Sequence, residues 1–135
     1  MGSRVAVCLL AIGLTACPPP TIVHLYNHTL QALEYCKGRS CRVILPSTEA
    51  EVPVPMSGGG FGFTITIDQG VHEYEVESLR NRDYAWRLET GNHFHVFLQV
   101  EPSLSLFLVP PDSQLPVSTP LPQPDGFPLR PLSAG

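Results

Sequence analysis

The sequence has few basic residues and no basic run. Its 135 residues include 8 Lys and Arg against 12 Asp and Glu, which gives a formal net charge of -4. Proteins that bind nucleic acid usually carry a basic patch, so we expect no nucleic-acid partner. The second half also lacks any run close to the roughly 20 apolar residues of a membrane-spanning helix. No alternation of strands and helices appears, which disfavours a parallel α/β fold.

Signatures of catalysis are missing as well. The sequence contains no G-x-S-x-G elbow, and the glycines at 58–60 lack the lysine and the spacing of a phosphate-binding loop. Cys36 and Cys41 do not have the C-x-x-C spacing of a redox motif. We therefore predict that the protein is not an enzyme and that it needs no cofactor.

The N-terminal segment carries the most specific pattern. A positive residue, Arg4, precedes a short apolar run, Val5–Leu14, and the segment closes on Leu-Thr-Ala-Cys17. The apolar run is too short to span a bilayer permanently and is typical of a signal peptide. The closing four residues, from Leu14 to Cys17, resemble the bacterial lipobox, in which a large aliphatic residue and two small ones precede the cysteine.

The resemblance to bacterial lipoproteins implies a specific modification. In that family the cysteine thiol receives diacylglycerol, and palmitate is among the acyl chains attached. Cleavage then removes the signal peptide, here residues 1–16, and leaves Cys17 first. Two or three acyl chains make a stable anchor. The residue after the cysteine is Pro18 and not aspartate, which by the enterobacterial family rule implies the outer membrane. An ordinary secretory signal, with a cysteine at this position by chance, is the alternative.

The body of the chain reads as a series of short strands. Residues 17–20 form the lipidated cysteine and a stiff proline spacer, and residues 21–110 form one domain. Alternating or β-branched segments are spaced about ten residues apart, as in β-sandwiches and barrels. We predict an all-β fold, a small antiparallel β-sandwich of Ig-like or transthyretin-like architecture. We expect seven or eight strands among residues 21–26, 30–35, 42–45, 49–52, 61–67, 71–77, 83–88, 93–100 and 103–109. The segment 30–35 also suits a helix, and 49–52 is a candidate edge strand.

Proline dominates the last part of the sequence, residues 111–135. Prolines at this density disfavour both a helix and a sheet ladder, so we expect a disordered, extended tail. An alternative is that Pro128–Pro131, which has P-x-x-P spacing, binds an aromatic groove on a partner.

The two cysteines of the body form a pair distinct from Cys8 and Cys17, which belong to the N-terminal segment. In an exported protein we expect Cys36 and Cys41 to form a disulfide. Closing so short a loop adds about 2 kcal/mol of stability in the chain-entropy model.

Histidines are the other residues that could bind a ligand. His93 and His95 are two residues apart in an expected strand and so share a face, and His24 could join them across a sheet. Imidazoles bind copper, nickel and zinc, but no third ligand follows from the spacing. We therefore predict no metal site. If one exists, these three histidines are its candidate ligands, and the alternative function is then a histidine-based metal-binding carrier.

Together these patterns predict a lipoprotein of the cell envelope, anchored in the outer membrane and facing the periplasm. Its β-sandwich acts as a non-enzymatic binding or structural module with a protein partner. The candidate contact surfaces are the Phe97 side of the strand at 93–100 and the proline-rich tail. An accessory lipoprotein of an envelope or secretion machine is a further alternative, supported by architecture alone.

Overall fold

A computed structural model of the chain describes residues 20–55, 59–79, 86–118 and 121–132. The predicted signal peptide and Cys17 lie outside these residues, as do the first half of the expected strand at 83–88 and part of the glycine run. The described chain forms nine strands: β1 (Thr21–Asn27), β2 (Leu33–Lys37), β3 (Ser40–Ile44), β4 (Glu49–Val52), β5 (Phe61–Ile67), β6 (Gly70–Val76), β7 (Arg87–Thr90), β8 (His93–Val100) and β9 (Leu106–Val109). No helix that is long and apolar enough to cross a membrane occurs in the described chain.

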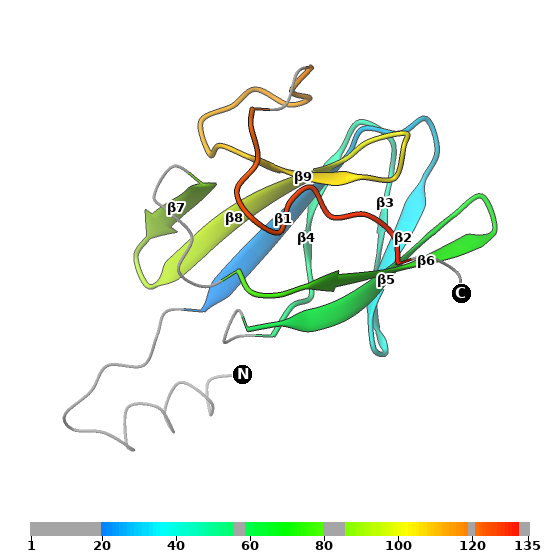
Figure 1. Cartoon of the computed structure of the whole chain (residues 1–135), viewed down its shortest axis with the longest axis horizontal. Helices are drawn as coiled ribbons and strands as arrows, with labels where there is room; N and C mark the ends of the chain where they lie inside the picture. Colours follow the sequence, from blue (N-terminus) through cyan, green and yellow to red (C-terminus); the bar gives the residue numbers. More distant parts are fainter. Residues whose placement is uncertain (1–19, 56–58, 80–85, 119–120, 133–135) are drawn as a thin grey trace.

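The strands form two sheets that pack face to face, as Figure 1 shows. The first sheet has the order β4-β1-β8-β7, and β9 pairs with the second half of β8 along the same edge as β7. The second sheet has the order β3-β2-β5-β6. The prediction of an all-β sandwich is therefore confirmed, and β4 is an edge strand, as the prolines that follow it indicate.

Alternation in the sequence explains which side chains form the core. In β5, Phe63 and Ile65 are buried, and in β6 so are Tyr74 and Val76, whereas the intervening glutamates of β6 are exposed. The ring of Phe63 stacks between those of Tyr35 and Tyr74, with centroids 5.0 and 5.1 Å away. Stacked aromatic rings from three adjacent strands thus form part of the inner face of the second sheet, within the shared core.

One pairing departs from the expected antiparallel arrangement. β1 and β8 run parallel, with Thr21 opposite Phe94 and Asn27 opposite Val100. All the other strand pairs are antiparallel. Parallel neighbours need a long connection, and here that connection contains the whole second sheet.

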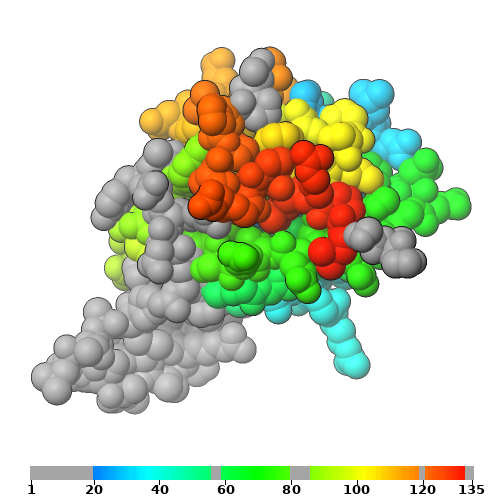
Figure 2. Space-filling view, viewed as in Figure 1, coloured from blue at the N-terminus to red at the C-terminus, as the bar shows by residue number. Residues whose placement is uncertain are grey.

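The C-terminal segment corrects the prediction of a disordered tail. Its described residues run back along the sandwich, between β9 and β6, as Figures 1 and 2 show. Phe127 and Leu129 are buried in the core, and Leu129 exchanges two backbone hydrogen bonds with Leu106, each 2.9 Å long. The backbone N–H of Leu132 donates to the carbonyl oxygen of Glu73 in β6 over 2.8 Å. The folded body therefore extends past residue 110, to at least Leu132.

The physical reason is that two glutamine side chains, one in β8 and one in the C-terminal segment, make hydrogen bonds between this segment and the sandwich. Gln99, which is fully buried, accepts from the backbone N–H of Val117 over 2.8 Å and donates to its carbonyl oxygen over 3.0 Å. Gln123 likewise accepts from the N–H of Leu108 over 2.7 Å and donates to its oxygen over 3.0 Å. Side-chain amides thus replace the backbone hydrogen bonds that a sheet would form, and the burial of apolar side chains between the prolines stabilises the segment.

Candidate functional site

The outer face of the first sheet gathers the predicted histidines. In β1 the buried residues Val23 and Leu25 point into the core, so His24 between them points outward. In β8 the buried Val96 turns His95 to the same outer face. Because Ile22 lies opposite His95 in the parallel register, His24 and His95 are diagonal neighbours.

The two rings are in direct contact. Nε2 of His24 lies 2.9 Å from Nδ1 of His95, and the ring centroids are 5.2 Å apart with an interplanar angle of 22°. Phe97 stacks on the His24 ring with a centroid distance of 4.6 Å and an angle of 10°. The His24 side chain is 15% exposed. This packing fixes the plane of the His24 ring while its edge stays accessible from solvent.

Each ring also has a partner on its other nitrogen. Nδ1 of His24 lies 3.3 Å from a carboxylate oxygen of Glu49 in β4, and Nε2 of His95 lies 2.7 Å from the hydroxyl oxygen of Thr90 in β7. An ionised carboxylate only accepts, so the proton of neutral His24 is on Nδ1 and its Nε2 is a free acceptor. His95 then donates from Nδ1 to His24 and accepts from the hydroxyl of Thr90. Four strands thus contribute one connected polar chain.

The surroundings favour an uncharged His95. Burial lowers the pKa of its imidazole below the usual value for histidine, and the neighbouring His24 and His93 lower it further, whereas Glu51 acts in the opposite direction. The ring is therefore neutral at neutral pH and keeps a lone pair for a proton or an ion. Chemically, the chain of Thr90, His95, His24 and Glu49 can conduct a proton or hold a cation.

The structure brings together two of the three candidate histidines and leaves the third beside them. His93 is exposed, and its ring centroid lies 6.3 Å from that of His95. His28 pairs instead with Glu101 at the other end of β1, and His72 belongs to β6 in the second sheet. Glu49 and Thr90 did not emerge from the sequence, because their roles depend on pairings across the sheet that spacing along the chain does not reveal.

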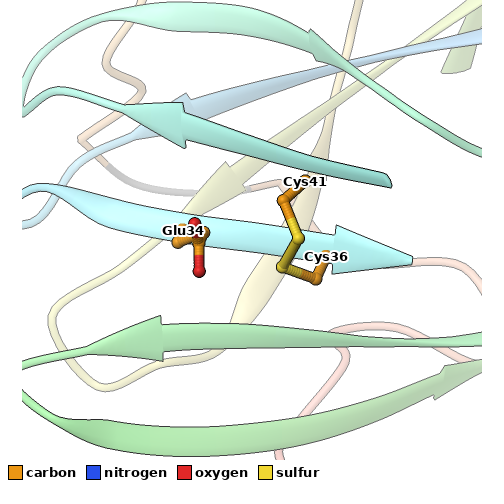
Figure 3. A group of neighbouring side chains, drawn as sticks. All are labelled: Glu34, Cys36 and Cys41. Carbon is orange, nitrogen blue, oxygen red and sulfur yellow. A yellow bond between two sulfur atoms is a disulfide. The ribbon is translucent and has the colours of Figure 1, made fainter. Parts of the chain in front are cut away.

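The predicted cysteine pair lies in the second sheet. Cys36 and Cys41 face each other across the β2–β3 hairpin, with Cα atoms 4.1 Å apart and the sulfur atoms joined in a disulfide. Figure 3 shows Glu34 beside the disulfide, on β2. A carboxylate oxygen of Glu34 lies within 4.8 Å of both sulfur atoms. Sulfur atoms bonded to each other offer no thiolate, so the oxidised hairpin is a structural element and not a metal-binding group.

Comparison with known proteins adds no relative to this description: no family model, curated protein or solved structure matches the chain. The Ig-like or transthyretin-like architecture therefore stays a prediction, while the β-sandwich itself is shown by the strand pairing.

Proposed function

We propose that the chain is a lipid-anchored protein of the bacterial cell envelope, held to the membrane through Cys17, and that its β-sandwich is a non-enzymatic binding module. The observation that carries the proposal is the resemblance of Leu14–Cys17 to a lipobox directly before a folded body. The first strand begins at Thr21, so only a proline spacer separates the anchor from the sandwich.

The fold gives the proposed anchor an orientation. The N–H of Phe94 donates to the carbonyl oxygen of Pro20 over 3.0 Å, which ties the start of β1 to the start of β8. The β7–β8 turn at Gly91 lies at the same end of the sheet. A three-residue polyproline segment is about 9 Å long, so in this proposal this end of the sandwich lies close to the lipid surface.

The opposite end of the sandwich then faces away from the membrane, and we propose it as the surface for a protein partner. An open hollow there is lined by residues that include Leu30, Ile67 and Leu104. Leu30 is 94% exposed, although an exposed leucine alone is common on protein surfaces. An accessible disulfide hairpin in the same domain fits an oxidising compartment, such as the periplasm. This end of the sandwich is a second proposed partner surface, besides the Phe97 side of β8. Part of that outer face of β8 is covered by the segment around Val117.

Metabolic labelling with radioactive palmitate in a bacterial host tests the anchor. We expect label on the wild-type chain and on Cys8→Ser, and none on Cys17→Ser, because only the lipobox cysteine accepts diacylglycerol. Cys8→Ser is the matched control, since it removes the other N-terminal thiol and leaves the lipobox intact. An unlabelled wild type, or label that persists in Cys17→Ser, would overturn the proposal.

A further inference from the structure

We propose that His24 and His95 form a binding site for one late first-row divalent metal ion, with copper(II) bound most tightly. This site belongs to the folded body, so it is independent of the lipid anchor. The ion replaces the proton that the two facing nitrogens share, and Nε2 of His24 and Nδ1 of His95 are its ligands.

The spacing of the two nitrogens fits this role. Metal–nitrogen bonds to imidazole measure about 2.0–2.1 Å, and two such bonds at a right angle place the nitrogens about 2.9 Å apart. The two facing nitrogens lie 2.9 Å apart in the structure. Right-angled ligand pairs are typical of the tetragonal geometry of copper(II) and nickel(II), whereas tetrahedral zinc needs a wider separation. The ion displaces the hydrogen bond between the two nitrogens, and because Phe97 holds the plane of the His24 ring, the His95 ring turns until both lone pairs converge on the ion.

The outer partners of the histidines are those expected around a metal ligand. Metal-binding imidazoles usually donate their second N–H to a carboxylate or another oxygen, which fixes the tautomer and makes the ligand more basic. His24 has Glu49 in this position, and His95 has Thr90, whose hydroxyl also accepts a hydrogen bond when His95 carries its proton on Nε2. With both outer nitrogens protonated, both facing nitrogens are unprotonated and free to bind.

Further ligands are available on the same face. His93 lies beside His95 on β8, and Glu51 is opposite His24 in the β1–β4 pairing, close enough to influence the charge of His95. A carboxylate near the site also offsets part of the positive charge that the ion introduces. The titratable groups that face His95 are thus His24, His93 and Glu51. Within the described residues no third ligand atom converges with those of His24 and His95, so His93 or Glu51 would have to move toward the ion, or water would complete its coordination.

Titration calorimetry of the purified, untagged full chain with copper(II) and zinc tests the site. We expect one ion per chain, with copper bound more tightly than zinc. His24→Gln and His95→Gln should each lower the affinity at least about 10-fold, and Glu49→Gln should lower it about 10-fold through loss of the outer partner. His28→Gln is the matched control, because it removes another histidine that pairs with a carboxylate, and it should bind as the wild type does.

Two further readouts separate this site from unspecific binding. The electron paramagnetic resonance spectrum of the copper complex should show coupling to imidazole nitrogen that weakens in His95→Gln. Affinity should fall as the pH is lowered, because protons compete with the ion for the same two nitrogens. Circular dichroism checks that each variant is folded, and Glu49→Gln keeps the test decisive if a histidine variant is not. Absence of one-to-one binding, or equal affinity of the wild type and a folded His95→Gln, would overturn the proposal.

Discussion

The replacement of Leu129 by alanine probes whether the C-terminal segment is part of the folded body. Leu129 is 6% exposed and belongs to the hydrophobic core, although it lies outside the nine strands. Core leucine-to-alanine changes cost about 2–5 kcal/mol, with the smaller values where the surroundings can collapse into the space. The segment contacts the sheets along one side and can shift inward, so we expect a loss of about 2–3 kcal/mol in the free energy of unfolding.

Urea denaturation followed by circular dichroism measures this loss, and calorimetry should show a midpoint lower by about 10–20 °C for a domain of this size. Leu132→Ala is the matched control, because Leu132 is in the same segment but is 46% exposed. It should change stability by less than about 0.5 kcal/mol. If Leu129→Ala is as stable as Leu132→Ala, the segment does not pack as described, and the tail is disordered after all.

Three further changes test other parts of the fold. Asn27→Ala should lower the free energy of unfolding by about 3 kcal/mol in urea denaturation. The buried amide of Asn27 donates to the carbonyl oxygens of Gln31 and Ile44 and accepts twice from Thr29, so its loss leaves these groups unpaired. The control Asn92→Ala, in an exposed turn, should not change stability. Reduction of the Cys36–Cys41 disulfide should lower the free energy of unfolding of the wild type by about 2 kcal/mol. The same reductant should not change the stability of the variant with serine at both positions. An unaltered unfolding midpoint of the reduced wild type would contradict a stabilising role of the disulfide. Burial raises the pKa of Tyr74 to about 12 and that of Tyr35 further. Their neutral forms therefore stabilise the fold below the unfolded pKa of about 10, and this stability is lost as the pH rises above that value. Absorbance at 295 nm should show the ionisation of these two tyrosines only together with unfolding, and ionisation of all tyrosines in a single step near pH 10 with unchanged circular dichroism would refute the prediction.

The sequence predicted those parts of the fold that depend on neighbouring residues. Alternation along β5, β6 and β8 identified these strands, and the same alternation is seen in their buried side chains, including Phe63, Tyr74 and Val96. The short separation of Cys36 and Cys41 identified the pair that the β2–β3 hairpin brings together. Side-chain direction has a period of two in a strand, so local pattern is enough for such inferences.

The sequence could not predict relations between distant segments. The contact of His24 with His95, 71 residues apart, depends on the parallel register of β1 and β8, and Glu49 and Thr90 join them through two further pairings. The prediction of a disordered tail was wrong for a related reason, because proline content describes what a backbone cannot do by itself. In the fold, Gln99 of β8 bonds the tail backbone at Val117, and Gln123 of the tail bonds the backbone of Leu108 in β9.

The parallel pairing of β1 with β8 also bears on when the chain can fold. The second sheet joins segments within residues 33–76, so it can form from local hairpins and one short crossover. The first sheet cannot close until β8 is free to meet β1, which requires a loop of more than 60 residues to be brought together. Proteins dominated by such distant contacts fold slowly. β1 can pair early with β4, but its other edge stays open until β8 is available. If the chain is exported as proposed, this edge therefore waits until about residue 100 has crossed the membrane.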